Sequence, residues 1–391
     1  MSEHIVESEQ RVTPLELFFD LVFVFAFTQV TTLLLDHVSW GGLGRGLLVL
    51  AVLWWAWASY AWLTNTVDAE AGPVMAVILV AIGAMFVAAL AVPEAFGSHR
   101  LVFALALLVV LATFIGLFAL AGRDEPDLLA AVLRMSRTTF LGGALILGAA
   151  FVGSGLRPAF WVAALAVGFV APGLRGVRGW RVQPAHFAER HGLIVIIAIG
   201  EALVAIGFGA RNTALGGGVV IASVLGLVVA ASFWLAYFDF FSAGVQRLLS
   251  ERRGEQRVAL ARDAYTYLHL PMVVGIVLFA FGTRTTLAHV HSRLHVIPAL
   301  ALCCGSALYL LAYVALRWRV SRRLSRGRAA ASVGFLVSLA VAVVVPAIAT
   351  LSLVAAIWIG LHAYELIWWR EARARRRAAD PPRGQIIEHA G

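Results

Sequence analysis

The chain has 391 residues, of which 61% are apolar and only 14% are charged. Soluble domains are typically about 45–50% apolar and about 25% charged, so this composition excludes a soluble enzyme and a disulfide-stapled secreted domain. One transmembrane helix uses about 20 apolar residues, and the apolar content therefore suffices for about twelve spans. We predict an all-α polytopic membrane protein.

The formal net charge of +9 would suggest nucleic-acid binding in a soluble chain. All 31 basic residues are arginine, and they concentrate in alternate connections between the apolar stretches. Charge arranged in this way sets membrane topology, so we expect no nucleic-acid partner.

Twelve apolar stretches are long enough to span a membrane. In chain order they lie at about 14–35, 43–63, 73–92, 100–120, 128–152, 158–173, 187–208, 216–240, 263–282, 295–316, 329–345 and 347–368. Only Pro346 separates the last two, so one very long helix is the alternative there. The short connections leave no room for a soluble domain.

The arginines orient these spans. With twelve spans and a cytoplasmic N-terminus, 25 of the 31 arginines are cytoplasmic, and those outside are Arg45, Arg100, Arg157, Arg211, Arg284 and Arg293. This bias follows the positive-inside rule. Eleven spans would place the arginine-rich tail opposite the arginine-rich 317–328 loop, so we predict twelve spans with both termini in the cytoplasm.

A weak internal repeat divides the chain. A shift of 172 residues lays Phe19–Thr31 over His191–Leu203, and Gln29 then meets Glu201. Six spans per repeat would give parallel halves related by an axis along the membrane normal, although apolar segments match easily by chance. The predicted parts are a cytoplasmic tail (1–13), a first half (14–173), a cytoplasmic linker (174–186), a second half (187–369) and an arginine-rich cytoplasmic tail (370–391).

Ionisable side chains inside the spans are candidate functional residues, because each costs about 2.5–3.5 kcal/mol at the bilayer centre. Glu16 and Asp20 are four residues apart and share a helix face. Glu201 lies about ten residues beyond His191, on the order of 15 Å deeper, near the middle of the membrane. The other candidates lie in the cytoplasmic half of their spans and are Glu189, His191, Asp239, Asp263 and His269.

This distribution predicts a cavity that opens to the cytoplasm and narrows toward Glu201. The alternative is that the carboxylates pair with arginines and lock helices together; Arg11, Arg134, Arg137, Arg190 and Arg262 are the available partners. Glu201 has no evident partner nearby in the sequence, which favours proton, cation or substrate contact. His191 and His269 are either proton relays, since imidazole titrates near neutrality, or packing residues.

Other sequence features are weaker evidence of function. Trp54 and Trp55 lie too deep for an interfacial belt and either line a ligand pocket or pack in the core. No catalytic motif is present, and we expect no enzymatic activity, no cofactor and no metal site. The arginines from Arg370 onward are expected to contact anionic lipid headgroups.

Three segments resemble the bacterial low-temperature-requirement protein A (LtrA) family. They are Pro14-Leu-Glu-Leu-Phe-Phe-Asp-Leu-Val-Phe-Val-Phe-Ala26, Glu189-Arg-His-Gly-Leu-Ile-Val-Ile-Ile-Ala-Ile-Gly-Glu201 and Ala264-Tyr-Thr-Tyr-Leu-His-Leu-Pro271. The resemblance covers about residues 11–369 and implies a multi-pass protein of the bacterial inner membrane, linked to growth in the cold, without implying a reaction. By motif match it carries over Glu16, Asp20, Glu189, His191, Glu201 and His269.

The leading functional hypothesis is a secondary transporter or ion-coupled permease with an unidentified small substrate or ion, in which Glu201 and Asp20 are the coupling or substrate-contact groups. The alternative is a regulatory or scaffolding membrane protein whose carboxylates lock helices. A third hypothesis, an intramembrane enzyme acting on lipid, would need a cavity that opens sideways to the bilayer.

Overall fold

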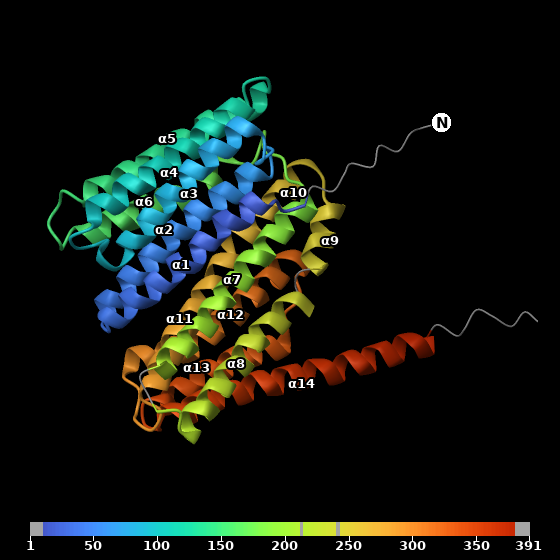
Figure 1. Cartoon of the computed structure of the whole chain (residues 1–391). Coiled ribbons are helices and arrows are strands. Elements are labelled where there is room, and N and C mark those ends of the chain that lie inside the picture. Colours follow the sequence, from blue (N-terminus) through green and yellow to red (C-terminus); the bar gives the residue numbers. More distant parts are fainter. Residues whose placement is uncertain (1–10, 212–213, 240–242, 380–391) are drawn as a thin grey trace, which may run out of the picture.

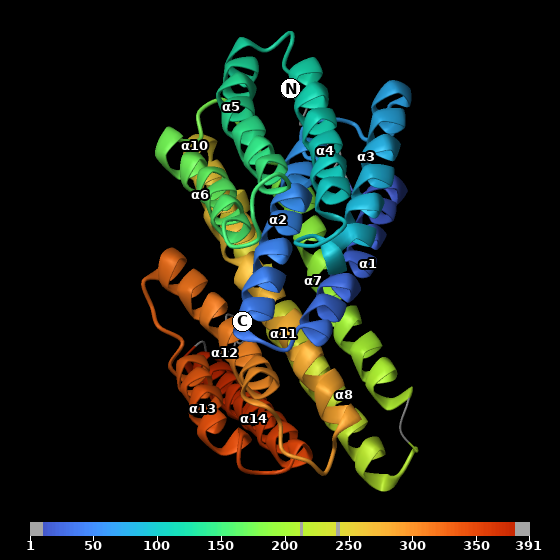
Figure 2. The same cartoon turned by 90° about the vertical axis from the view of Figure 1, so that its left-hand side faces the viewer.

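The computed structural model describes residues 11–211, 214–239 and 243–379, and this part of the chain is helical throughout, with no strand. Figures 1 and 2 show the helices from two sides. Their bounds are α1 (Pro14–Asp36), α2 (Trp40–Thr64), α3 (Gly72–Ala91), η1 (Val92–Glu94), α4 (Arg100–Ala121), α5 (Pro126–Ala149), α6 (Arg157–Arg175), α7 (Pro184–Arg211), α8 (Gly217–Tyr237), α9 (Ala243–Glu251), α10 (Gly254–Ala261), η3 (Arg262–Tyr267), α11 (His269–Ala288), α12 (Val296–Ser321), α13 (Arg326–Ala342) and α14 (Ala347–Ala379).

Ten helices of the described chain are long and apolar enough to cross a membrane. The prediction of a polytopic all-α protein is therefore confirmed. The remaining two predicted spans are helices as well, but α6 is a shorter apolar helix over the part Arg157–Val170 whose side chains are described, and α13 has 17 residues with Arg326 and Arg328 in its first turn. Twelve crossings, and the side on which the termini lie, stay predictions.

The last two predicted spans form separate helices, so the alternative of one very long helix is wrong. The chain turns between Ala342 and Ala347. After this turn the backbone N–H groups of Ala347 and Ile348 donate to the carbonyls of Ser292 and Val290, in the connection between α11 and α12. These bonds satisfy donors at the start of α14 that have no partner within the helix.

The helices form two groups with a shared centre. Helices α3–α6 lie on one side of the molecule and α8, α12, α13 and α14 on the other (Figures 1 and 2). Helices α1, α2, α7 and α11 meet between them, because α1 packs on α7 and α11, and α2 packs on the same two helices. The candidate residues of α1 and α7 therefore lie where the two groups join.

Small residues allow the closest helix approach, between α11 and α12. A Cβ atom added at Gly275 would lie 2.5 Å from the carbonyl oxygen of Gly305, and one added at Gly305 would lie 2.6 Å from that of Gly275. Both distances are too short for a side chain, so the two backbones touch at this point. Such glycine contacts are typical of helix pairs in membranes.

Candidate functional site

Helices α1 and α7 run side by side and in parallel, as two pairs of contacts show. Near the start of both helices Arg190 of α7 contacts Glu16 and Asp20 of α1. Further along both helices, Glu201 of α7 contacts Thr28 of α1. The residues singled out by the sequence thus occupy two separate positions on one helix interface, which we call the Arg190 end and the Glu201 end.

Glu16 is placed by the cap of its own helix. The hydroxyl of Thr13 accepts from the backbone N–H of Glu16 at 3.3 Å, and the Glu16 carboxylate accepts from the backbone N–H of Thr13 at 2.8 Å. This reciprocal arrangement is a capping box, which satisfies two donors at a helix start. It holds the carboxylate next to α7, where it is 2% exposed.

Arg190 binds both carboxylates of α1 at once. One terminal nitrogen donates to Glu16 Oε1 at 2.6 Å and the other to Asp20 Oδ1 at 2.8 Å. The first also donates to the Thr64 hydroxyl at 3.0 Å, and the indole N–H of Trp57 donates to Asp20 Oδ1 at 2.8 Å. Arg190 and Asp20 are both fully buried, so these bonds replace the water that the charges would otherwise bind.

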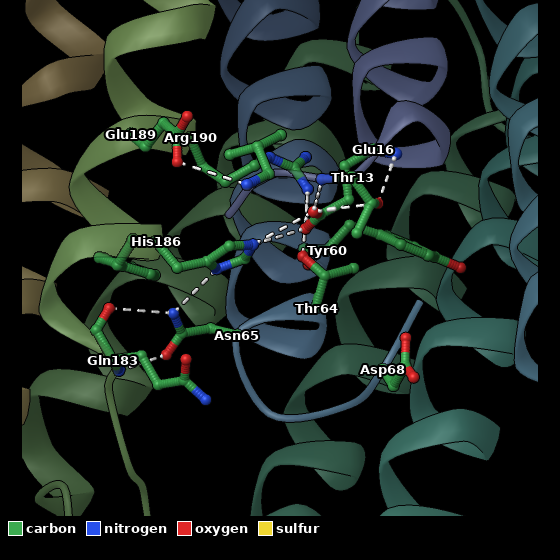
Figure 3. A network of polar contacts seen from close by, with 12 residues as sticks. Thr13, Glu16, Tyr60, Thr64, Asn65, Asp68, Gln183, His186, Glu189 and Arg190 are labelled. Atoms are coloured by element: carbon green, nitrogen blue, oxygen red, sulfur yellow. Dashed lines mark hydrogen bonds and ion pairs between the residues drawn. The ribbon is translucent and has the colours of Figure 1, made fainter. Parts of the chain in front are cut away.

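His186 completes the Arg190 end, and the sequence analysis missed it. Its Nε2 lies 3.1 Å from the Glu16 carboxylate and its Nδ1 lies 3.1 Å from Asn65 Nδ2 (Figure 3). Asn65 Oδ1 accepts from the backbone N–H of Gln183 at 2.7 Å, which orients the amide so that its nitrogen donates to His186. The only sequence signal is that His186 precedes Arg190 by one helical turn and so shares its face.

These bonds determine the proton on His186. Because Nδ1 accepts from Asn65, it carries no proton, and the ring is a neutral imidazole that donates from Nε2 to Glu16. Two carboxylates then face one guanidinium, so the Arg190 end holds more acidic groups than cationic ones. Asp20 Oδ2 is buried and has no hydrogen-bond partner among the described residues. A proton or a water molecule on that oxygen would complete the cluster.

The Glu201 end contains a carboxylate without an ion pair among the described residues, and the cation that acts on it is Arg284 of α11, beyond ion-pair distance. Glu201 is 1% exposed, and no ion pair joins it to an arginine or histidine within the described part of the chain. The hydroxyl of Thr28 donates to Glu201 Oε2 at 2.5 Å. Thr31, on α1 as well, is fully buried, and its hydroxyl is a second side-chain partner of the Glu201 carboxylate.

His191 and His269 come together next to the Arg190 end. Their rings lie 5.2 Å apart and both contact the ring of Tyr265, at 4.8 and 4.9 Å. Nδ1 of His269 lies 2.9 Å from the carbonyl oxygen of Ala264, and a carbonyl only accepts, so Nδ1 holds the proton. Nε2 of His269 then accepts from the Tyr237 hydroxyl at 2.9 Å.

His191 has the same tautomer for the same reason, since its Nδ1 lies 2.8 Å from the carbonyl oxygen of Phe187. Its Nε2 therefore carries no proton and can only accept a hydrogen bond. Neither this nitrogen nor the Tyr265 hydroxyl has a hydrogen-bond partner among the described atoms. Tyr265 belongs to the π-helical segment η3, a rare irregularity that is frequent at functional sites. Tyr265 lies in the family-like stretch of residues 264–271, but it was not singled out as a candidate, and the π-helical segment was not predicted.

Three predicted residues lie outside these clusters. Glu189 is exposed and accepts only a long bond, 3.3 Å, from the backbone N–H of Val12. Asp239 is exposed and follows the end of α8. Asp263 pairs with Arg262 and Arg319 at 2.8 and 2.9 Å. For Asp263, Glu16 and Asp20 the structure therefore has the arginine pairing that the locking interpretation predicted.

The Arg190 and Glu201 ends offer carboxylates, one guanidinium and hydroxyls. Among the described residues, no group of three or more His, Cys, Asp or Glu side chains is placed to hold a metal ion. The groups present can exchange protons or bind a small cation. The arginine-rich tail lies outside this description, since residues 380–391 are not described and the side chains from Trp369 onward are not either.

The fold and these clusters define a multi-pass helical membrane protein with buried ionisable groups at its central helix interface. The sequence matches the family described as bacterial low temperature requirement A protein (LtrA) over residues 11–363, and the chain belongs to this family. It is similar to the uncharacterized protein RA0937 of Rhizobium meliloti (strain 1021), with 30% identity over 333 residues that cover 79% of this chain and 77% of that protein. No solved structure gives a significant match.

Proposed function

We propose that this protein is an ion-coupled secondary transporter of the bacterial inner membrane, with Glu201 as the coupling group and Asp20 as a second proton site. The observation that carries the proposal is the difference between the buried carboxylates at the two ends of the α1–α7 interface. Arg190 forms ion pairs with Glu16 and Asp20, whereas Glu201 is buried and accepts a hydrogen bond from the Thr28 hydroxyl. A buried charge without a partner is costly, and a proton or a cation that binds and leaves would offset that cost.

The position of the cluster supports the same proposal. Transporters built from two halves hold their coupling groups near the bilayer midplane, at the interface between the halves. Helix α1 belongs to the predicted first half and α7 to the second, and Glu201 lies 17 residues beyond the start of α7 at Pro184, which is about 25 Å along the helix.

Helix packing supports the division into two six-helix halves. In the first half α1 packs on α2 and α3, α3 on α4, α4 on α5, α5 on α6, and α6 on α2. In the second half α7 packs on α8 and α11, α11 on α12, α12 on α13, α13 on α14, and α14 on α8. With α9 and α10 set aside, each of these six pairs has its counterpart in the other half, whereas the packing of α2 on α4, of α11 on α8 and α14, and of α12 on α14 has none among the stronger contacts. If the chain crosses the membrane twelve times with both termini in the cytoplasm, the two six-helix halves have the same orientation in the membrane.

The test is flux into liposomes that contain the purified protein and a trapped pH indicator, assayed with a panel of ions and small metabolites under an imposed proton gradient. We expect Glu201→Gln to abolish substrate-dependent proton movement. Glu251→Gln is the matched control, because Glu251 is an exposed partner of Arg247 on α9, and it should keep the wild-type flux. Equal flux through wild type and Glu201→Gln would refute the role of Glu201.

The physiological part of the proposal is a requirement for this transport during growth in the cold, without any enzymatic step. A deletion strain carrying Glu201→Gln should then grow at the ordinary growth temperature and fail at low temperature, as we expect of the deletion itself. The control strain carries Glu251→Gln and should grow at both temperatures. Cold growth restored by Glu201→Gln would separate the phenotype from transport.

A second candidate function is a regulatory or scaffolding membrane protein, and two buried arginines favour it. Besides Arg190, Arg328 of α13 is 1% exposed and donates to Glu365 of α14 at 2.7 Å. Both pairs join helices and would serve a rigid scaffold. This function predicts that Glu201→Gln supports cold growth and that wild-type liposomes show no more flux than empty ones.

A further inference from the structure

A cavity of about 110 Å³ lies away from the α1–α7 interface, among α2, α5, α10 and the connection from α6 to α7. Trp55, one of the two deep tryptophans of α2, lines it. Trp54 does not, because its indole is buried and donates to the carbonyl of Thr266 at 2.8 Å. Trp55 is therefore a candidate pocket residue, and Trp54 packs in the core.

The cavity has aromatic walls and two arginines in its lining. Its aromatic lining residues are Trp55, Trp62, Phe114, Trp180 and Tyr267. Arg134 and Arg262 also line it, whereas no carboxylate does. The Arg262 guanidinium lies 5.8 Å from the centre of the Tyr267 ring, which holds it in place by a cation–π contact.

The charges around the cavity favour an anion. Arg262 shares Asp263 with Arg319, so this group of three carries one net positive charge. Arg134 donates to the carbonyl of Arg178 at 3.2 Å and brings a second guanidinium to the lining. Guanidinium groups are the usual protein ligands of carboxylates and phosphates.

An apolar slot continues from the cavity along α5 and α6. Trp55 and Thr138 line both spaces, and the slot adds about 40 Å³ between Leu107, Ile146 and Gly168. Arg134 and Ile146 are twelve residues apart on α5, so the slot reaches about 18 Å from the cationic end. The space is therefore polar and positive at one end and apolar at the other.

We propose that this cavity and slot bind an amphipathic anion, with its carboxylate or phosphate between Arg134 and Arg262 and an apolar chain in the slot toward Gly168. One water-sized group needs about 10–15 Å³ of such volume, so the two spaces admit a ligand of about ten non-hydrogen atoms. The site is separate from Glu201 and does not depend on transport. The same chemistry occurs in a free medium-chain carboxylate and in an anionic lipid.

Binding of decanoate to the purified full-length protein in nonionic detergent, followed by calorimetry, tests the proposal. We expect saturable decanoate binding, and no saturable binding of the matched cation decyltrimethylammonium. Arg134→Gln should weaken decanoate binding about tenfold or more, equivalent to about 1.4 kcal/mol. The control is Arg137→Gln, since Arg137 is an exposed neighbour on α5 that does not line the cavity, and it should bind decanoate as the wild type does.

A second variant tests the slot through the chain length of the bound anion, which a general loss of stability would not change. A Cβ at Gly168 would lie 3.5 Å from the Trp55 ring, an ordinary contact, so Gly168→Leu fills the slot without displacing backbone. It should abolish decanoate binding and keep hexanoate binding. Equal binding of the anion and the cation, equal weakening by Arg134→Gln and Arg137→Gln, or an unchanged chain-length preference in Gly168→Leu would each overturn the proposal.

The source of the anion is found by repeating the titration in lipid nanodiscs. If an anionic lipid occupies the site, phosphatidylglycerol in the disc will compete with decanoate, whereas pure phosphatidylcholine will not. If decanoate binds equally in both discs, the natural ligand is a free organic anion. Either result upholds the amphipathic-anion site and identifies which of the two sources fills it.

Discussion

The two ends of the α1–α7 interface bury carboxylates in opposite ways. At one end Arg190 holds Glu16 and Asp20 within 2.8 Å, and Thr64, Trp57, His186 and Asn65 complete the network. At the other end Glu201 is bound by the hydroxyl of Thr28. A cluster whose carboxylates are paired with a guanidinium favours one fixed packing, while a carboxylate held by hydroxyls can gain and lose a cation. We therefore expect mutations at the Arg190 end to act on stability and mutations at the Glu201 end to act on function.

The largest expected effect is that of Arg190→Leu. Removing the guanidinium leaves Glu16 and Asp20 buried without a counter-charge, and breaking a buried pair in this way costs about 3–5 kcal/mol. The measurement is the free energy of unfolding in detergent, with Arg137→Gln as the exposed control, which should change it by less than about 0.5 kcal/mol. A loss of less than about 1 kcal/mol in Arg190→Leu would show that the cluster does not lock the helices.

The triple variant Glu16→Gln, Asp20→Asn, Arg190→Leu separates charge from packing. Once all three charges are gone, no uncompensated charge remains, and we expect the triple variant to be more stable than Arg190→Leu alone. Non-additivity of this kind is the mark of residues that act as one network. Additive losses would mean that the three side chains contribute independently.

Asp20→Asn has a smaller expected effect. Asparagine keeps the shape and one oxygen that can accept from Trp57, but it weakens the charge-assisted bond with Arg190, which is worth about 1.5–3 kcal/mol. We expect a loss in that range, measured by the same unfolding assay. Glu189→Gln is the matched control, because Glu189 is exposed one residue before Arg190, and its stability should equal that of the wild type.

Thr28→Val tests the hydroxyl that donates to Glu201 at the other end. It removes the hydroxyl that donates to Glu201 and replaces it by a methyl group of similar size, so we expect a loss of about 1 kcal/mol. In a Glu201→Leu background the hydroxyl has lost this acceptor, and the same substitution should have almost no effect on stability. An equal effect in both backgrounds would mean that Thr28 stabilises α1 through its own backbone bond, since its hydroxyl also lies 3.1 Å from the carbonyl oxygen of Val24.

The helical membrane architecture could be predicted from the sequence because it depends on local properties. Apolar stretches of about 20 residues mark the spans, and the pair Thr13 and Glu16 marks the start of α1. The break before α14 follows from Pro346, which lacks the N–H that a continuous helix needs. The less apolar predicted spans are less clear. Helix α13, with 17 residues and two arginines in its first turn, is not among the ten helices of the described chain that are long and apolar enough to cross a membrane.

The candidate site was only partly predictable, because its partners are far apart in the chain. Asp20 and Glu201 stand out as acids in apolar segments, but the contact of Arg190 with α1 spans about 170 residues and is invisible to local patterns. His186 was missed because its partners Glu16 and Asn65 are far away in the chain. Tyr265, within the family-like 264–271 stretch, was not singled out because its contact with His191 is also distant in sequence. The expected cavity narrowing toward Glu201 rested on depth alone, and the aromatic cavity beside Trp55 contains none of the predicted carboxylates.

The smallest expected effect on stability is that of Glu201→Gln, and it is the sharpest test of the difference between the two ends. Glutamine is close to glutamate in size, keeps an oxygen that accepts from Thr28, and removes a buried carboxyl group that forms no ion pair within the described chain, so the free energy of unfolding should stay within about 0.5 kcal/mol of the wild type. Flux and cold growth should nevertheless be lost, because an amide cannot take up and release a proton. A loss of stability as large as that of Asp20→Asn would mean that Glu201 is a structural residue too, and that the two ends of the interface do the same work.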